Sequence, residues 1–432
     1  MRAPPSRHAS LLFLLLVGLA LPLPACGGDE DEATPGGTAA GAASATLGPP
    51  ATSASTDQFG PGVTDSQIII GAHCPLTGAL AAMYATIPQA TTAYFNYIND
   101  TEGGVCGRKI VYKVEDDNYD AAKALEVTRK LVEQDKVLAI VGALGAHPSA
   151  FDYLNEAGVP DLLLSTASHR FVSDPQTYPW TVLMIPDYTL EGTYFGQYIS
   201  ENLPGEKVAV LYENSYFGIE DLAGLKQGLD PTNQVVSEQP YDPVAVDIRS
   251  EVTNMKNSGA DVAVLLTTPG YTVQAVKAAA RLGWEPQFLA SYVNSDDMMF
   301  QFASPELLEG MITFQALKMS AWAGDPAIAR HYEIMSKYSG PAPSNFTVYA
   351  QALAELAVEV LSRACDNLTR QGLMDAIESI RAWRSDLLVE GVDVTVSDTD
   401  HTVLDTGRML RVVVENGKGR FEYFGPIYYL RE

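Results

Sequence analysis

Residues 67–80 read QIIIGAHCPLTGAL and contain the clearest strand in the chain. The β-branched run at residues 68–70 ends at Gly71, in front of residues that are typical of turns. A helical pattern begins near Pro88, and the apolar residues after it recur on one helical face. The stretch therefore predicts a buried strand that leads through a polar loop into a helix.

The same order of strand and helix recurs along most of the chain. Short apolar runs that end in polar loops occur in KIVYKVEDD, VLAIVGALG, PDLLLSTAS, KVAVLYENSYFG, ADVAVLLTTPG and PQFLASYV. Strands that are apolar on both faces and alternate with helices indicate parallel sheets of the α/β class. Residues 345–382 predict consecutive helices, and Asn416-Gly417 predicts the turn of a closing hairpin.

The loops that follow the strands are the expected ligand site. In open parallel sheets, ligands gather at the carboxyl ends of the strands, where loops and helix N-termini meet. The loops HCPLTGAL, EDDNYD, ALGAHPS, STASHR, ENSYFG, TTPGYT and SYVNSDD are rich in Ser, Thr, Gly, Tyr and Asp. These residue types favour a small polar solute that is held by hydrogen bonds and covered by aromatic side chains.

The first 62 residues differ in composition from the rest of the chain. Residues 1–25 combine two arginines with a short apolar core and a small residue at Ala25, which is typical of a secretory signal peptide. The core is shorter than the ~20 residues that a membrane-spanning helix needs. Cys26 follows Leu-Pro-Ala, which resembles a bacterial lipobox, although Pro24 departs from the usual small residue. Residues 26–62 are rich in Gly, Ala, Ser, Thr and Pro and predict a disordered tether.

These features predict an exported protein that is anchored by a lipid on Cys26 to the bacterial cell envelope, on its periplasmic or outer cell-surface side. An ordinary signal peptide followed by an incidental cysteine is the alternative. The formal net charge is −25, and removal of the two arginines of the leader makes it more negative. Such a surface repels nucleic-acid phosphates and anionic lipid. We therefore expect no nucleic-acid partner, and no membrane contact apart from the lipid anchor.

The sequence contains none of the common catalytic motifs. It lacks GxSxG, HExxH, CxxC, a P-loop and a complete GxGxxG. We therefore expect no enzyme activity, no cofactor and no metal site. Scattered Ser, His and Asp side chains can still meet in space, so an exported enzyme stays open as an alternative.

Five segments follow one another in a specific order: IIIGAHCPLTGALA, YFNYINDTEGGVCGRKIVYKVEDDNYDAAKA, KLVEQDKVLAIVG, EAGVPDLLLSTAS and VLYENSYFGIEDL. In this order they resemble the branched-chain amino-acid-type substrate-binding proteins of ABC transporters, which have the type I periplasmic-binding-protein fold. The resemblance covers residues 66–430 and is clearest in the first half. It implies two doubly wound α/β lobes joined by three chain crossings. Lobe 1 would comprise residues 66–187 plus 315–395, and lobe 2 residues 188–314 plus parts of 396–432.

The resemblance also implies a function. Members of this family close their two lobes around a small solute, deliver it to a membrane permease and perform no chemistry. We therefore expect a monomer that captures an amino acid or a related small carboxylate for an ABC permease. A binding protein that reports its ligand to a separate signalling partner is the second interpretation.

The family pattern implies a set of ligand contacts from both lobes. They are Thr77, Gly78, Met83, Ala146, His147, Ser165, Thr166, Ser168, His169, Tyr216, Phe217, Tyr271 and Asp296. Met83 stands where an aromatic residue often packs on the ligand. Gly145 or Ala146 stands where a family Ser binds the ligand carboxylate, so backbone N–H groups would have to replace that hydroxyl. Asp296 stands near the acid that takes an ammonium group.

Several of these residues have simpler interpretations. Thr77 and Gly78 can merely turn the chain after a strand, and Phe217 can be core packing. Asp296 can be a solvated loop acid. The neighbouring pair Asp116-Asp117 is expected to cap the helix that begins around Tyr119–Ala121.

Three histidines follow successive strands of lobe 1. If those strands are neighbours, His73, His147 and His169 can face the cleft, where they would hold an anion, make binding sensitive to pH or bind a metal. The alternative is three unrelated loop histidines. No i,i+4 spacing supports a metal site.

The cysteines beyond Cys26 number three. Cys74 follows the end of a strand and Cys106 precedes the next strand, so they lie at opposite edges of a parallel sheet, beyond the ~5.5 Å Cα separation of a disulfide. Cys365 stands at the end of a lobe 1 helix in the implied fold. We therefore predict a Cys106–Cys365 bond, with Cys74 as a buried thiol.

Overall fold

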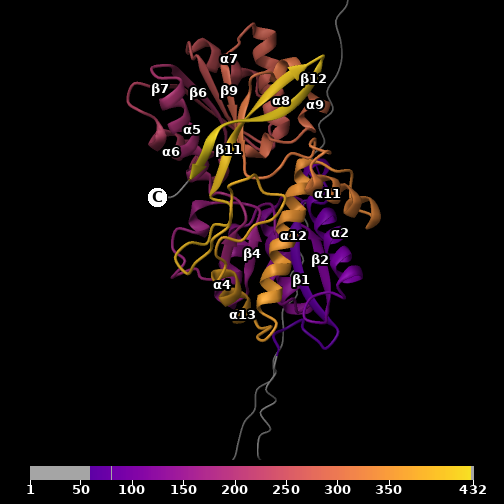
Figure 1. The fold of residues 1–432 in the computed structure, drawn as a ribbon. Coiled ribbons are helices and arrows are strands. Elements are labelled where there is room, and N and C mark those ends of the chain that lie inside the picture. Colours follow the sequence, from indigo (N-terminus) through magenta and orange to yellow (C-terminus); the bar gives the residue numbers. More distant parts are fainter. Residues whose placement is uncertain (1–58, 79, 430–432) are drawn as a thin grey trace, which may run out of the picture. The chain divides into compact units, whose positions relative to one another are not determined.

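The computed structural model describes residues 59–78 and 80–429. The predicted signal peptide, the lipidation site at Cys26 and nearly all of the predicted tether lie outside these residues. Two sheets with helices packed around them make up the described part of the chain (Figure 1). Among the described residues, no helix combines the length and the apolar character that crossing a membrane requires.

The first sheet has five parallel strands in the order β2-β1-β3-β4-β5. The strands are β1 (Gln67–Cys74), β2 (Lys109–Asp116), β3 (Ile140–Val141), β4 (Asp161–Leu164) and β5 (Thr181–Leu183). β1 contains the isoleucine run, in which Ile68 and Ile70 are fully buried. The strand order reverses at β1, so the loops after β1 and β3 meet at one edge, as in doubly wound folds. The predicted α/β class is confirmed.

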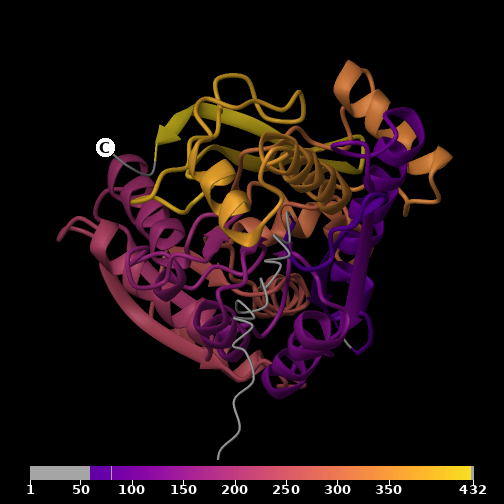
Figure 2. The ribbon, with the colours of Figure 1, turned by 90° about the horizontal axis from the view of Figure 1, so that it is seen from below.

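Helices from both ends of the described chain pack around this sheet. α2 (Thr86–Thr101) lies beside α12 (Asn345–Arg363), and α3 (Ala121–Arg129) lies beside α4 (Pro148–Ala157). α3 continues into one π-helical turn at Lys130–Gln134. Figure 2 shows the orange segments of the last third of the chain next to the indigo and purple segments of the first third. A capping box between Ser344 and Thr347 satisfies the first N–H groups of α12, which explains where this helix begins.

The second sheet has seven strands in the order β12-β11-β10-β9-β8-β6-β7. They are β6 (Lys207–Glu213), β7 (Gln234–Tyr241), β8 (Val262–Leu266), β9 (Gln287–Ala290), β10 (Ile312–Gln315), β11 (Thr406–Glu415) and β12 (Lys418–Tyr429). The pairs from β7 to β10 are parallel, whereas β11 and β12 are antiparallel additions at the edge. Asn416 and Gly417 join these two strands with φ angles of 54° and 74°, as a tight hairpin turn requires. The predicted hairpin is confirmed.

Helices pack around the second sheet, two of them through close glycine contacts. The long ones are α5 (Tyr188–Asn202), α6 (Tyr216–Gly228), α7 (Arg249–Asn257) and α8 (Pro269–Leu282). α5 and α6 touch along glycine faces, since a Cβ on Gly192 would stand 1.9 Å from the carbonyl oxygen of Asp221. The remaining helices are α1 (Ala81–Tyr84), α9 (Met299–Phe302), α10 (Pro305–Leu308), α11 (Pro326–Lys337) and α13 (Arg370–Glu378), with 3₁₀ turns at His169–Phe171 and Tyr292–Asn294.

The chain passes between the two sheets three times: between β5 and α5, between β10 and α11, and before β11. Residues 317–404 stay with the first sheet. Two isolated β-bridges hold this segment, one between Thr402 and Leu183 of β5 and one between Leu388 and Leu317. We use "first lobe" for residues 59–186 and 317–404, and "second lobe" for residues 188–315 and 406–429. Figure 1 shows α4, α12 and α13 in the first lobe and α7, α8 and α9 in the second.

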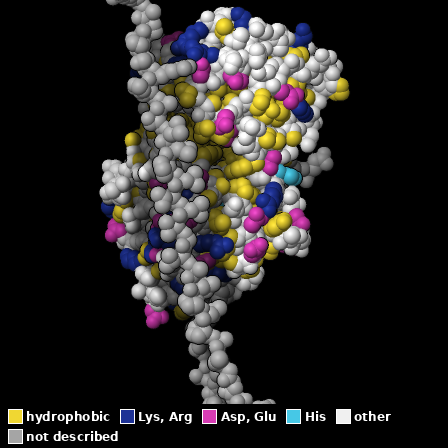
Figure 3. Space-filling model, turned by 180° about the vertical axis from the view of Figure 1, so that it is seen from behind, with side chains coloured by type: hydrophobic (Ala, Val, Ile, Leu, Met, Phe, Trp, Pro, Cys, Tyr) yellow, Lys and Arg dark blue, Asp and Glu magenta, His cyan; other side chains and the backbone are white. Residues whose placement is uncertain are grey.

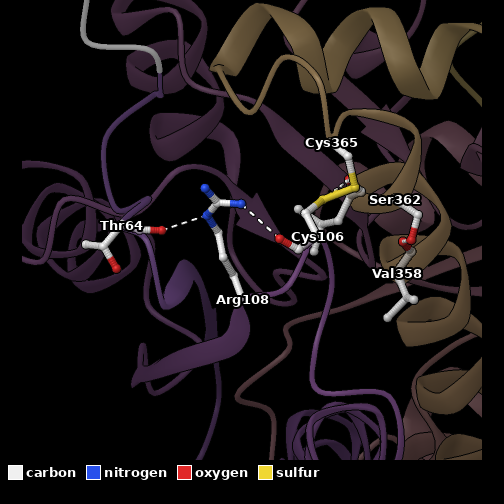
Figure 4. The surroundings of a disulfide bond; sticks show 7 residues. Thr64, Cys106, Arg108, Val358, Ser362 and Cys365 are labelled. Carbon is white, nitrogen blue, oxygen red and sulfur yellow. Dashed lines mark hydrogen bonds between the residues drawn. A yellow bond between two sulfur atoms is a disulfide. The ribbon is translucent and has the colours of Figure 1, made fainter.

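A disulfide joins the two chain segments that build the first lobe. Cys106 and Cys365, the pair predicted from the sequence, are bonded, with their Cα atoms 5.4 Å apart (Figure 4). Arg108 braces the same loop because its guanidinium group donates to the carbonyl oxygens of Thr64 and Cys106. Cys74 is a free, buried thiol, and burial raises its pKa well above the usual value.

Candidate functional site

A cavity of about 90 Å³ lies between the two lobes, at the carboxyl ends of their strands. Leu144 and Ser165 in its wall belong to the first lobe, whereas Phe217 and Thr268 belong to the second. This volume has room for several water molecules or a small solute. Lys, Arg and His are absent from the described residues that line it. The cavity is therefore a mostly uncharged space that both lobes share.

Aromatic side chains dominate the wall. They are Tyr84, Tyr119, Tyr188, Phe217, Tyr292, Phe314, Phe346 and Tyr349. The phenolic oxygen of Tyr292 is buried and has no hydrogen-bond partner within the described part of the chain, so it is free to bond to a ligand. Hydrophobic side chains also gather across the middle of one face of the molecule (Figure 3). The wall is suited to the apolar or aromatic body of a small molecule.

Tyr119 reaches the wall from a strained loop. Asn118 and Tyr119 have φ angles of 49° and 58°, which non-glycine residues seldom adopt. Asp116 accepts from the N–H of Asn118, and Asp117 accepts from the N–H of Tyr119, so these carboxylates hold the turn. The expectation that Asp116-Asp117 caps the next helix is wrong, because Asp120 caps α3 by accepting from the N–H of Lys123.

Ser165, Thr166 and Phe217 are predicted contacts that line the cavity. The hydroxyl of Ser165 lies 2.6 Å from the phenolic oxygen of Tyr349, and that of Thr166 lies 2.9 Å from the phenolic oxygen of Tyr216. Phe217 is buried and packs on the ring of Tyr188 at 4.8 Å between ring centres. The two hydroxyls are thus already paired, and a ligand has to share or replace these bonds.

Tyr216 links the lobes rather than forming part of the wall. It begins α6 of the second lobe, and its hydroxyl also lies 3.2 Å from the carbonyl oxygen of Gly145 in the first lobe. Loss of water on burial raises the pKa of Tyr216 to about 12, so the phenol stays a hydrogen-bond donor at physiological pH. Because Gly145 and Thr166 both line the cavity, Tyr216 braces the wall from behind.

Ser168 and His169 are outside the wall and bind Glu220 of α6. One carboxylate oxygen of Glu220 accepts from the hydroxyl of Ser168 at 2.6 Å, and the other accepts from the N–H of His169 at 2.7 Å. The imidazole of His169 is 52% exposed and lies 3.4 Å from Asp187. These two donors, which the family pattern assigns to the ligand, thus hold a carboxylate of the opposite lobe.

Asp296 lines the cavity, but both of its oxygens have partners. They accept from the N–H of Met298 at 2.8 Å and from the N–H of Phe346, in the first turn of α12, at 3.0 Å. The carboxylate therefore binds the positive end of a helix of the other lobe. Burial raises the pKa of Asp296 above its ordinary value.

Four other predicted contacts do not line the cavity. Thr77 is exposed and donates to Asp116, and Gly78 turns the chain beside it with a φ of 84°. Met83 is buried, and its neighbour Tyr84 supplies the aromatic wall instead. Tyr271 packs on Tyr241, and its hydroxyl bonds to carbonyl oxygens in the loop after β7.

The predicted carboxylate loop reaches the cavity through Leu144 and Gly145, whereas Ala146 and His147 are not in the wall. His147 turns inward, and Nδ1 of its ring lies 2.8 Å from Nε2 of His73. Both imidazoles are fully buried, whereas that of His169 is half exposed on another loop. The hypothesis that three imidazoles face the cleft is therefore wrong. No metal-binding group of three or more His, Cys, Asp or Glu is present in the described ranges.

Sequence reasoning missed most of the aromatic wall. Tyr119 and Tyr292 lie in loops that follow strands, so a search of those loops for aromatic residues finds them. Phe346 and Tyr349 lie in the first turns of α12, which no strand precedes directly. Only the return of α12 to the first lobe brings them to the cavity, and this return is a property of the tertiary fold.

The family of the chain follows from comparison with known proteins. A family model described as "Periplasmic binding protein" matches residues 67–418. The chain belongs to this family. A protein of Pseudomonas aeruginosa named "Amino acid binding protein" is 23% identical over 301 residues, which cover 66% of this chain and 76% of that protein.

Solved structures of ABC-transporter proteins share the two-lobed fold. A branched-chain amino acid ABC transporter protein from Thermus thermophilus, with bound valine, has a TM-score of 0.75 and 21% identity, covering 85% of this chain and 97% of that chain. A fatty acid ABC transporter substrate-binding protein from Thermomonospora curvata has a TM-score of 0.73 and 24% identity, covering 86% and 94%. These likenesses confirm the type I periplasmic-binding-protein fold.

Proposed function

We propose that this chain is an extracytoplasmic solute-binding lipoprotein, which captures an amino acid or related small carboxylate and delivers it to an ABC permease. The observation that carries the proposal is the cavity, because residues of both lobes line it at the ends of their strands. Membership of the periplasmic binding protein family supports a role in binding rather than in chemistry. The eight rings in the wall favour a solute with an apolar or aromatic body.

Capture works by closure of the lobes on the solute. The proposed domains are residues 66–187 plus 315–395 and residues 188–314, moving about the three crossings as a monomer. A ligand that touches both lobes stabilises the closed form and shifts the population towards it. Tyr216 and Glu220 add contacts of α6 with the first lobe that exist only when the lobes are closed.

The proposed anchor is a lipid on Cys26, added after removal of residues 1–25. Residues 26–62 would then act as a flexible spacer, so that the binding body works in the fluid beside the membrane. A single anchored chain with no other membrane contact can move between capture and docking on the permease.

Thermal unfolding of the mature chain with a panel of solutes tests the proposal. The panel contains branched and aromatic amino acids, hydroxybenzoates and short fatty acids. We expect at least one member to raise the unfolding temperature, since a ligand at a hundredfold its Kd adds about 2.7 kcal/mol of stability. Small-angle scattering with that member should report a more compact body.

Two variants separate the cavity from the rest of the surface. Phe217→Ala removes a ring of the wall and should weaken binding of the stabilising solute about tenfold or more. Phe302→Ala is the control, because Phe302 is 46% exposed and does not line the cavity. Equal loss of affinity in both variants, or stabilisation by no panel member, would count against the proposal.

A further inference from the structure

Four buried ionisable side chains form one line of hydrogen bonds beneath the loop at residues 142–147, which we call the ligand loop. Oδ2 of Asp117 lies 2.6 Å from Nδ1 of His73, and Nε2 of His73 lies 2.8 Å from Nδ1 of His147. Nε2 of His147 then lies 2.8 Å from Oδ2 of Asp161. All four side chains are fully buried. We call Asp117, His73, His147 and Asp161 the Asp-His-His-Asp unit.

The unit supports three parts of the cavity wall. The carboxylate of Asp117 accepts from the N–H of Tyr119, and its Oδ2 lies 2.6 Å from the place of a Cβ on Gly145. The N–H of Leu144 donates to the carbonyl oxygen of His73. Tyr119, Leu144 and Gly145 all line the cavity, so movement within the unit moves the wall.

The hydrogen bonds of the unit require one more proton than two neutral imidazoles supply. Three hydrogen bonds require three protons, one between each pair of neighbours. Two neutral imidazoles beside two carboxylates bring only two protons, so one contact would then set two lone pairs against each other. A third proton removes that repulsion and reduces the charge of the unit from −2 to −1. In a fully buried site both effects favour keeping the third proton.

The surroundings supply no other countercharge. In the described part of the chain, no Lys or Arg forms a hydrogen bond or ion pair with the unit. The groups that face it are the thiol of Cys74, the backbone N–H of Tyr119, the phenol of Tyr216 and the hydroxyl of Thr181, and Asp116 adds a carboxylate on the side of Cys74. Burial lowers the pKa of His73, although its hydrogen bond to Asp117 opposes this. At the other end of the unit, Oδ1 of Asp161 has no hydrogen-bond partner among the described residues.

We propose that the Asp-His-His-Asp unit positions the ligand loop at residues 142–147, and that it does so only while three protons occupy its three hydrogen bonds. The role of the unit in solute capture rests on the proposed function. The number of bound protons and the position of the loop are independent of that function. Above pH 7 the unfolded chain holds two protons on these groups, because a free imidazole has a pKa of about 6.5. The folded unit binds one more proton. Its contribution to the free energy of unfolding therefore falls as the pH rises through the pKa at which the folded unit loses that proton.

The test is a titration of the ligand-free mature chain by NMR, with ¹⁵N-labelled histidine and backbone. Between pH 5 and pH 10 we expect one step above pH 7 in the ring-nitrogen shifts of both His73 and His147. The backbone amides of Tyr119, Leu144 and Gly145 should shift with the same midpoint, because the wall follows the unit. A purely structural role would not make the wall titrate with the rings.

Asp161→Asn gives the sharper result. An Asn amide donates to Nε2 of His147, so three hydrogen bonds are satisfied by two neutral imidazoles and the step should disappear. Asp187→Asn is the matched control, since Asp187 faces His169 and caps α5, and Asn caps equally well. This control should keep the step.

Four outcomes would overturn the proposal: no step, separate titration of the two rings below pH 7, wall amides that do not follow the rings, or a step that survives in Asp161→Asn. If Asp161→Asn does not fold, the wild-type titration decides alone. Because no solute is present, failure of the solute panel leaves this result standing, and a stabilising solute does not rescue it.

Discussion

In the proposed closure of the lobes, Glu220 is a carboxylate whose surroundings change. Its two oxygens accept from Ser168 and His169 across the interface. Loss of water on burial raises its pKa above the ordinary value, despite these two hydrogen bonds. When the lobes open, the carboxylate returns to water and to its ordinary pKa. Closure therefore takes up protons, and the closed form is favoured as the pH falls through the raised pKa.

Proton uptake on closure predicts how the affinity for the solute depends on pH. Between pH 7 and pH 5, affinity of the wild type should increase severalfold for the solute found in the panel, measured by calorimetry. Glu220→Gln keeps a neutral hydrogen-bonding group and should weaken this dependence, to which Asp296 also contributes. Glu309→Gln, at an exposed position outside the cavity wall, should behave like the wild type. Affinity that falls towards pH 5, or an unchanged slope in Glu220→Gln, would contradict the assignment.

At the level of single residues, the sequence predicts which loops reach the site better than which side chains line the cavity. The aromatic wall begins at Tyr84, one residue beyond the predicted Met83. The family pattern assigns Ser168 and His169 to the ligand, but their partner in the structure is Glu220, about fifty residues away in α6 of the second lobe. A loop follows from local pattern, whereas the partner that a hydroxyl finds depends on how the lobes meet.

Close helix packing in the second lobe depends on glycine. A Cβ on Gly224 of α6 would stand 1.9 Å from the carbonyl oxygen of Thr189 in α5. Both atoms belong to helix backbones, so no side-chain rotation relieves the contact. The same packing buries Glu191 and Asp221 close together, and burial raises the pKa of Glu191 to about 7.

Gly224→Ala should therefore lower the free energy of unfolding by about 3 kcal/mol, because α5 and α6 have to separate. Urea unfolding followed by circular dichroism measures the change. Gly270→Ala is the matched control within a helix, since its Cβ would meet only the methyl group of Met83 at 4.0 Å. We expect this control to lie within about 1 kcal/mol of the wild type. Similar losses in both variants would mean that the α5–α6 contact is not the cause.

Elements with a strong apolar period were predictable, and elements without one were not. β8 is buried along its whole length and β1 along most of it, and both strands are predicted from the sequence. β7 reads QVVSEQPY and lies at the edge of its sheet, with only Tyr241 buried, so its pattern resembles a loop. The apolar run VLAIVGALG contains only two strand residues, Ile140–Val141, because the chain turns at Gly142 towards the ligand loop. An edge strand can thus lack the apolar pattern of a core strand, and a loop that serves a site can carry that pattern.

Over the whole molecule, the chain leaves the first lobe, builds most of the second and returns. The Cys106–Cys365 bond spans 259 residues of sequence and encloses this excursion. It fixes the returning helix α12 to the loop before β2, and α12 carries Phe346 and Tyr349 of the cavity wall. The bond therefore holds the first lobe together independently of the position of the second.

Removal of this bond should lower stability without changing the site. The double variant Cys106→Ala/Cys365→Ala should lose about 2–5 kcal/mol of unfolding free energy, since its unfolded chain is less constrained. Solute affinity at 25 °C should remain that of the wild type, because neither cysteine lines the cavity.

Reducing agent should lower the unfolding temperature of the wild type and of Cys74→Ala, whose disulfide is intact, but not that of the double variant. If the double variant loses affinity while folded, the bond shapes the cavity as well. If its unfolding temperature equals that of the wild type, the bond does not hold the first lobe together.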